Sequence, residues 1–262
     1  MTWPILAVAA AVLARLVWRW RRGAQRQRRL MLLCKRAGLG FAPWDQSPDT
    51  AWLPFPLFGR SPSGTENVVW DRTHGPEIRV FDFWYEEPAQ ERVAAPRRWL
   101  TCAVVPLAAS VPRLRIARRE LADDARTVLG LSEVRLELER FNRRFVVEAE
   151  DERFAFAFLE QRLMEGLLGL PDGVTVDTNG DALLLSSPRL PAEKVLVLFD
   201  SAVELHERIP RSLPSRYPPR PERGPHEDRW LQGRWSADPT AGASTDLTFG
   251  SRRTRRSGRR SG

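Results

Sequence analysis

The three histidines are the side chains of this sequence best suited to acid–base or metal chemistry, yet none has a suitable partner nearby. His74, His206 and His226 lie far apart, and none has a second His or Cys at the short spacing that zinc sites use. His74 follows Asp71, and the two could form a base and its orienting carboxylate, but no nucleophile stands at a recognisable spacing. The histidines therefore predict no metal site and no catalytic residue.

Three short motifs look like cofactor or catalytic loops and fail in their details. Gly59–Gly64 (GRSPSG) is one residue longer than a nucleophile elbow, and Pro62 blocks the helix that should follow. Gly38-Leu39-Gly40 lacks the third glycine of a dinucleotide-binding fingerprint. The run 177–181 (DTNGD) begins like a calcium loop, but its glycine is misplaced and no Glu stands at the twelfth position. We expect no cofactor, and we interpret Asn179-Gly180 as the turn of a β-hairpin.

The remaining charged and sulfur-containing residues favour structural roles. Glu137, Glu139, Glu148 and Glu150 alternate with apolar residues or lie beside arginines, which predicts cross-strand ion pairs on a wet sheet face rather than a general acid–base pair. The arginines concerned are Arg135, Arg143 and Arg144. Two cysteines, Cys34 and Cys102, are too few for a disulfide scaffold, and we expect reduced thiols in a cytosolic body.

The basic charge of the chain lies at its two ends. The net charge is +8, but residues 1–36 carry nine basic groups and no acid, and residues 209–262 carry 12 Arg against five acids. The middle, 37–208, is therefore acidic, with 20 basic and 28 acidic residues. Nucleic-acid binding needs a basic surface, so any such contact is expected through the C-terminal tail and not through the central domain.

The N-terminal segment predicts a membrane anchor. Trp3–Trp18 is apolar except at Arg15; as a helix it would extend roughly 24 Å, and continuation to Trp20 brings it close to the ~30 Å hydrocarbon core. We expect residues 1–22 to span the cell membrane once and 23–38 to form a basic juxtamembrane helix that attracts anionic lipid head groups.

The arginines that follow the span predict that the N-terminus lies outside the cell and the body in the cytoplasm. A helix lying on the membrane surface and a signal peptide are the alternatives. The candidate lipid-interface residues are Trp3, Arg15, Trp18, Arg19, Trp20, Arg21 and Arg22.

The central domain, 39–209, has the pattern of an α+β fold. Strands are expected at 66–72, 77–85, 99–107, 113–117, 134–138 and 145–150, and their short connections imply an antiparallel sheet. Helices are expected at 152–168 and 192–208, with the 173–185 hairpin between them, so that two helices cover one face of the sheet. The segment 39–64 is expected to be irregular and to pack on the domain through its aromatics, a ligand groove being the alternative. These aromatics are Phe41, Trp44, Trp52, Phe55 and Phe58.

The tail, 210–262, predicts disorder. Its first part is rich in proline, which favours an extended linker, and its last twelve residues (SRRTRRSGRRSG) contain no apolar side chain that could pack. Reversible contact with anionic lipid or RNA and a solvated tail without a partner are both open.

Residues 139–169 (ERFNRRFVVEAEDERFAFAFLEQRLMEGLLG) resemble a family of membrane-anchored, mostly actinobacterial proteins of unknown function. The resemblance extends over roughly 38–211, through GLGFAPWD, the hairpin strands ENVVWDR and EIRVFDFWY, and HERIPR. It implies a membrane-tethered domain and assigns no activity.

These patterns favour a membrane-anchored, non-catalytic interaction domain whose basic tail contacts anionic lipid, with the membrane and an unidentified protein as partners. A membrane-associated hydrolase with a site in loops 59–76 is the first alternative. Nucleic-acid contact through the tail is the second.

Overall fold

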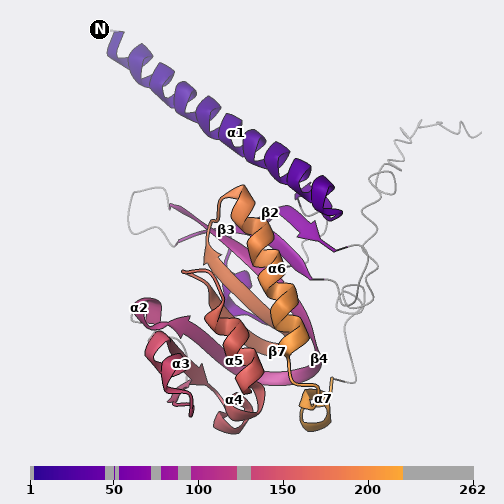
Figure 1. The fold of residues 1–262 in the computed structure, drawn as a ribbon. Coiled ribbons are helices and arrows are strands. Elements are labelled where there is room, and N and C mark those ends of the chain that lie inside the picture. Colours follow the sequence, from indigo (N-terminus) through magenta and orange to yellow (C-terminus); the bar gives the residue numbers. More distant parts are fainter. Residues whose placement is uncertain are drawn as a thin grey trace, which may run out of the picture.

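A single antiparallel sheet of seven strands organises the chain, which confirms the expected α+β class (Figure 1). The computed structural model describes residues 3–44, 50, 53–71, 78–87, 96–122 and 131–220, without the side chains of 3–9, 11–12, 14–16, 18–20 and 121–122. The strands are β1 (Gly40–Trp44), β2 (Ser63–Trp70), β3 (Arg79–Glu86), β4 (Arg97–Arg118), β5 (Ser132–Val134), β6 (Phe145–Ala149) and β7 (Thr175–Pro188). Their order is β1-β2-β3-β4-β6-β5, and β7 pairs with β4.

Two strands are longer than expected, and the predicted hairpin at Asn179-Gly180 is wrong. β7 continues through both residues and pairs with β4 from Leu100↔Pro188 to Ile116↔Val176. Gly180 has a φ of +59° and lies opposite Val111, between two register shifts. The extra residues lie in β4, between Pro106 and Leu114, so the left-handed conformation of Gly180 bends β7 opposite this bulge and does not end the strand in a turn. The two strands expected at 99–107 and 113–117 are likewise one strand, β4, which passes through Pro106 and Pro112 at the same irregularity.

The expected pairing of 66–72 with 77–85 is confirmed by β2 and β3, while most of its connection lies outside the described residues. The irregular segment 39–64 contains one strand that the sequence does not predict, β1, paired with β2. The 134–138 strand is wrong in its bounds: β5 ends at Val134, and the short helix α3 (Glu139–Arg144) follows. Glu137 and Glu139 therefore do not form the expected strand-face ion pairs.

The helices agree with the predicted apolar periodicity except at one break. α6 (Ala192–Arg208) has the predicted bounds and buries its apolar stripe. The helix expected at 152–168 is instead α4 (Glu152–Phe158) and α5 (Gln161–Leu168), because the backbone of Leu159 leaves the helical region. Asp151 caps α4 by accepting a hydrogen bond from the Arg153 amide at 2.9 Å. A short helix, α2 (Arg119–Ala122), follows β4 directly.

The first helix, α1 (Trp3–Ala37), joins the predicted anchor and juxtamembrane helix without a break. Gly38 ends it with a φ of +73°, as expected. Its C-terminal part contacts β1, β2 and α6, and Figure 1 shows its N-terminal end standing clear of the sheet. Among the described residues, no helix has both the length and the apolar character required to cross a membrane.

The sheet separates two apolar clusters. On one face, α1, α4, α5 and α6 bury side chains such as Leu30, Phe154, Leu163 and Leu198 against the strands. On the other face, segment 53–60, which contains the 3₁₀ turn η1 (Pro56–Gly59), packs Phe55 and Phe58 against the sheet. Helices therefore lie on one face of the sheet as expected, with four of them where two were expected, and among the described residues segment 53–60 packs on the second face.

The folded body extends past the predicted boundary at 209. A helical turn, α7 (Leu213–Arg216), buries Leu213, and the Tyr217 ring meets Phe154 edge-on at 5.2 Å. This part of the proline-rich segment is therefore packed, not extended. Residues 221–262 lie outside the described part of the chain.

Candidate functional site: a cavity on the second face of the sheet

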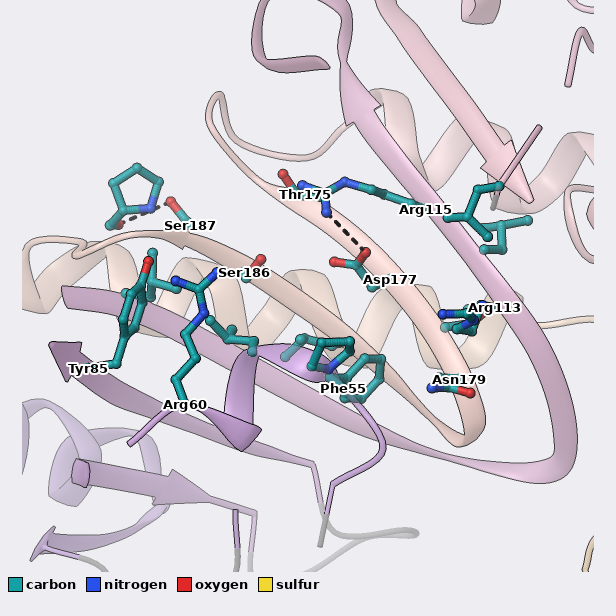
Figure 2. Close-up of a pocket in the computed structure, with 18 of the residues that line it drawn as sticks. Phe55, Arg60, Tyr85, Arg113, Arg115, Thr175, Asp177, Asn179, Ser186 and Ser187 are labelled. Carbon is teal, nitrogen blue, oxygen red and sulfur yellow. Dashed lines mark hydrogen bonds and ion pairs between the residues drawn. The ribbon is translucent and has the colours of Figure 1, made fainter. Parts of the chain in front are cut away.

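A cavity of about 520 Å³ lies on the face of the sheet opposite the helices, between segment 53–60 and the strands β4 and β7 (Figure 2). Side chains of both polar and apolar type surround it. They are Phe55, Pro56, Leu57, Arg60, Tyr85, Leu100, Arg113, Leu114, Arg115, Leu131, Gly173, Thr175, Asp177, Thr178, Asn179, Leu184, Ser186, Ser187 and Pro188. Its volume is in the range of small-molecule binding sites.

The register shifts of β4 and β7 create the site. On either side of Gly180, alternate residues of β7 face the cavity: Asp177 and Asn179 before the bulge, Leu184 and Ser186 after it. Figure 2 shows both strands turning sharply beyond Asn179. The Asn179 side-chain amide donates to the carbonyl oxygen of Pro54, which fastens segment 53–60 at this corner.

One end of the cavity is formed by Arg60, Tyr85, Ser186 and Ser187 (Figure 2). The Arg60 guanidinium lies over the Tyr85 ring, 4.4 Å from its centroid, in a cation–π contact. No ion pair joins Arg60 to a carboxylate of the described residues. The Ser187 hydroxyl donates to the Pro188 carbonyl at 3.1 Å.

The other end is formed by a row of charges that crosses the sheet. Glu133, Glu148, Arg115 and Asp177 are consecutive register partners on β5, β6, β4 and β7. The Arg115 Nη1 and Asp177 Oδ1 atoms are 3.9 Å apart, beyond hydrogen-bond distance, and these side chains are 28% and 23% exposed. Arg115 Nε is buried without a hydrogen-bond partner among the described residues. This pair therefore has unused hydrogen-bonding capacity.

The electrostatics of the row act on Asp177. Burial raises the pKa of its carboxyl to about 6; the Arg115 guanidinium opposes this shift, and the Glu148 carboxylate adds to it. At neutral pH, Asp177 is thus ionised but poorly solvated. On the rim, Arg113 is already paired, since its Nε lies 3.3 Å from Glu150 Oε2.

The described lining offers binding groups more than reactive ones. It contains hydroxyls, an amide, three guanidiniums and one carboxylate, and neither His nor Cys. Within the described parts of the chain, no group of three or more His, Cys, Asp or Glu side chains is placed to hold a metal ion. The arrangement suits reversible recognition of a polar molecule by hydrogen bonds.

A second polar cluster, centred on Asp82, joins α1 to the sheet. Arg26 donates to both carboxylate oxygens of Asp82, at 2.7 and 2.9 Å, and to the Leu190 carbonyl at 2.6 Å. Asn67 and Thr101 donate to the same carboxylate at 2.9 and 3.0 Å. Asp82 is only 1% exposed, so this cluster is an interior junction and not a ligand site. Arg189 completes it at 3.3 Å.

The candidate lipid-interface residues all lie on α1. Arg21 and Arg22 are exposed, whereas the side chains of Trp3, Arg15, Trp18, Arg19 and Trp20 are outside the described part. Their contact with lipid remains a prediction. His206 is half-buried on α6, where burial lowers its pKa, and His74 and His226 fall among residues that are not described.

The sequence did not lead us to either the polar lining of the cavity or the cluster around Asp82. Phe55 lines the cavity, in line with the alternative of a groove in segment 39–64, but Phe58 packs in the core and Trp44 is exposed. Asp82 carried a usable signal, because it is the one acid inside the apolar run Val80–Tyr85. Asp177 was visible only as part of a supposed turn.

The comparisons with known proteins bear on the fold. Neither a protein-family model nor a curated protein matches this chain. Among solved structures, the chain is similar to the crystal structure of the mycobacterial trehalose monomycolate transport factor A, TtfA, with a TM-score of 0.50 and 13% sequence identity. The alignment covers 75% of this chain and 98% of that one. At this identity, the likeness shows a shared fold.

Proposed function

We propose that this protein is a membrane-associated, non-catalytic accessory domain, held by its N-terminal helix with the body on the cytoplasmic side. The observation that carries the proposal is the continuity of α1. One helix contains the apolar run Trp3–Trp18 and, further along, side chains of the domain core.

The junction between α1 and the body supports a fixed tether. Leu30 and Cys34 are fully buried, and Arg26 is held by the Asp82 carboxylate. In contrast, Leu13 and Val17 are 63% and 42% exposed, although both are apolar. Insertion of this part of α1 into lipid would cover such side chains, and the arginines after it would remain at the cytoplasmic surface.

The shared fold supports the accessory role. The similar structure is named a trehalose monomycolate transport factor, and that name describes a role in transport. On that likeness, we propose that this chain assists the handling of a membrane lipid. The cavity on the second face of the sheet offers a place for a ligand and displays no described nucleophile with an adjacent base.

Fractionation of cells that express the full chain tests the proposal. We expect the protein in the membrane fraction, retained in alkaline carbonate and released by detergent. The matched control is a variant without residues 1–22, which we expect in the soluble fraction with an unchanged thermal unfolding midpoint. Release of the full chain by carbonate or salt alone would contradict membrane insertion.

The basic tail is proposed to contact anionic lipid, and truncation tests this separately. Removal of 221–262 should reduce binding to vesicles that contain phosphatidylglycerol and leave the fold intact, because Leu213 and Tyr217 remain in place. Unchanged vesicle binding would argue for a solvated tail without a partner.

A further inference from the structure

The cavity on the second face of the sheet has a pattern of hydrogen-bonding groups that points to a class of ligand. At the Asp177 end, a carboxylate that only accepts faces a guanidinium that only donates, and the two are too far apart to satisfy each other. Thr175 and Asn179 add a hydroxyl and an amide on the same strand. A ligand hydroxyl both donates and accepts, so adjacent hydroxyls of a sugar can bond to the Asp177 carboxylate and to Nη1 of Arg115 together.

The charges of the lining favour a neutral ligand over an anion. Arg113 is paired with Glu150, and Arg115 faces Asp177, with Glu148 as its partner on the other side. An anion placed near Arg115 would therefore meet two carboxylates. Arg60, at the far end, lies over the Tyr85 ring and keeps its positive charge, so the preference for a neutral ligand concerns the Asp177 end of the cavity. At the Asp177 end, a neutral, polyhydroxylated molecule avoids this repulsion and can still form hydrogen bonds with Asp177 and Arg115.

Apolar side chains line the space between the two polar ends. Leu100 and Leu184 come from the sheet, and Phe55 and Leu57 come from the segment that covers it. This surface suits a short hydrocarbon chain or the apolar face of a sugar ring.

From these observations, we propose that the cavity binds a neutral glycolipid, with its sugar held by Arg115 and Asp177 and its hydrocarbon lying on Leu57 and Leu100, which are only partly buried. The sugar part of this inference rests on the cavity, whereas the lipid part also rests on the proposed membrane function.

The test uses the full-length protein in lipid nanodiscs and an octyl glucoside with a photoreactive diazirine in its alkyl chain. After illumination, cross-linked peptides are identified by mass spectrometry. We expect labelling of peptides that contain 53–60 and 182–188, and stronger competition by unlabelled octyl glucoside than by octyl phosphate. Equal or stronger competition by octyl phosphate would overturn the assignment in favour of an anion site.

The decisive variant replaces Arg115→Met together with Asp177→Leu. Because both members of the pair become apolar at once, neither is left in the cavity as a charge without the other, although Glu148 loses its neighbouring cation on β4. We expect cavity labelling to fall about tenfold, the loss that corresponds to one or two hydrogen bonds. The matched control, Arg98→Met with Glu87→Leu, removes an exposed ion pair outside the cavity and should leave labelling unchanged.

Unfolding midpoints of all variants are measured in parallel. If the Arg115/Asp177 variant is not folded, Thr175→Val replaces it, and we expect about a threefold loss for one hydroxyl. Unchanged labelling in a folded variant would overturn the inference. A chain that stays in the membrane but shows no labelling of the cavity peptides would overturn this inference alone and leave the proposed function standing.

Discussion

Among single residues, Asp177 should make the stability of the protein depend on pH. The pKa of Asp177 in the folded state is about 6, above the ordinary value near 4. The folded protein therefore binds a proton at this carboxyl more tightly than the unfolded chain does. The free energy of unfolding should therefore fall as pH rises from about 4 to 6 and then level off. Asp177→Asn removes this cost. We expect the variant to gain about 2–3 kcal/mol over the wild type at pH 7 and little below pH 4, measured by denaturant unfolding across this range.

A change at Glu148 tests whether the pH effect on stability comes from Asp177. Glu148 raises the pKa of Asp177 from β6, on the far side of Arg115, so Glu148→Gln should lower the midpoint of the pH effect without abolishing it. A difference between wild type and Asp177→Asn that does not change between pH 4 and 7 would mean that Asp177 is well solvated.

Among the elements, the β4–β7 pair depends on the left-handed conformation of Gly180. A Cβ at this position would meet only ordinary contacts with Pro54, at 3.6 Å and beyond, so the cost of Gly180→Ala is backbone strain of about 1–2 kcal/mol. Gly23→Ala is the matched control, because Gly23 lies in α1 with nothing within 4 Å, and alanine there should stabilise the helix slightly. Thermal unfolding of both variants measures the difference. Equal midpoints would mean that the bulge tolerates a side chain.

The irregular pairing at Gly180 is the part of the fold that the sequence alone did not predict. Apolar periodicity is local, and it correctly gave α6 and the β2–β3 pairing. Asn179-Gly180 is the usual hairpin turn, but whether its left-handed residue makes a turn or a bulge is decided by pairing with Val111, far away in the sequence. The cavity depends on that pairing, so the meeting of Asp177 and Arg115 could not be inferred from spacing.

The attachment of α1 to the sheet is the other element-scale feature, and Arg26 should control it. Arg26→Met leaves the Asp82 carboxylate in the interior with less compensation, and we expect a loss of about 3 kcal/mol and faster hydrogen exchange over 21–37. The exposed pair of Arg29 with Glu193 joins α1 to α6 nearby, and Arg29→Met should cost less than about 1 kcal/mol. Similar losses in the two variants would show that Asp82 does not hold the helix.

The molecule as a whole is proposed to have a fixed orientation across the membrane, and its own cysteines make this measurable. Cys34 and Cys102 are buried, and burial raises the pKa of Cys34 to about 11, so both should be silent toward a membrane-impermeant maleimide in the folded protein. New cysteines at Thr2→Cys and at the exposed Ser215→Cys then report the two sides. We expect Thr2→Cys to react in intact cells and Ser215→Cys to react only after the membrane is opened. Because α1 is continuous and docked through Arg26, this result would also place the cavity on the cytoplasmic side. Reaction of Ser215→Cys in intact cells would reverse the orientation. Reaction of neither position in intact cells, and of both after the membrane is opened, would indicate a helix that lies on the cytoplasmic surface.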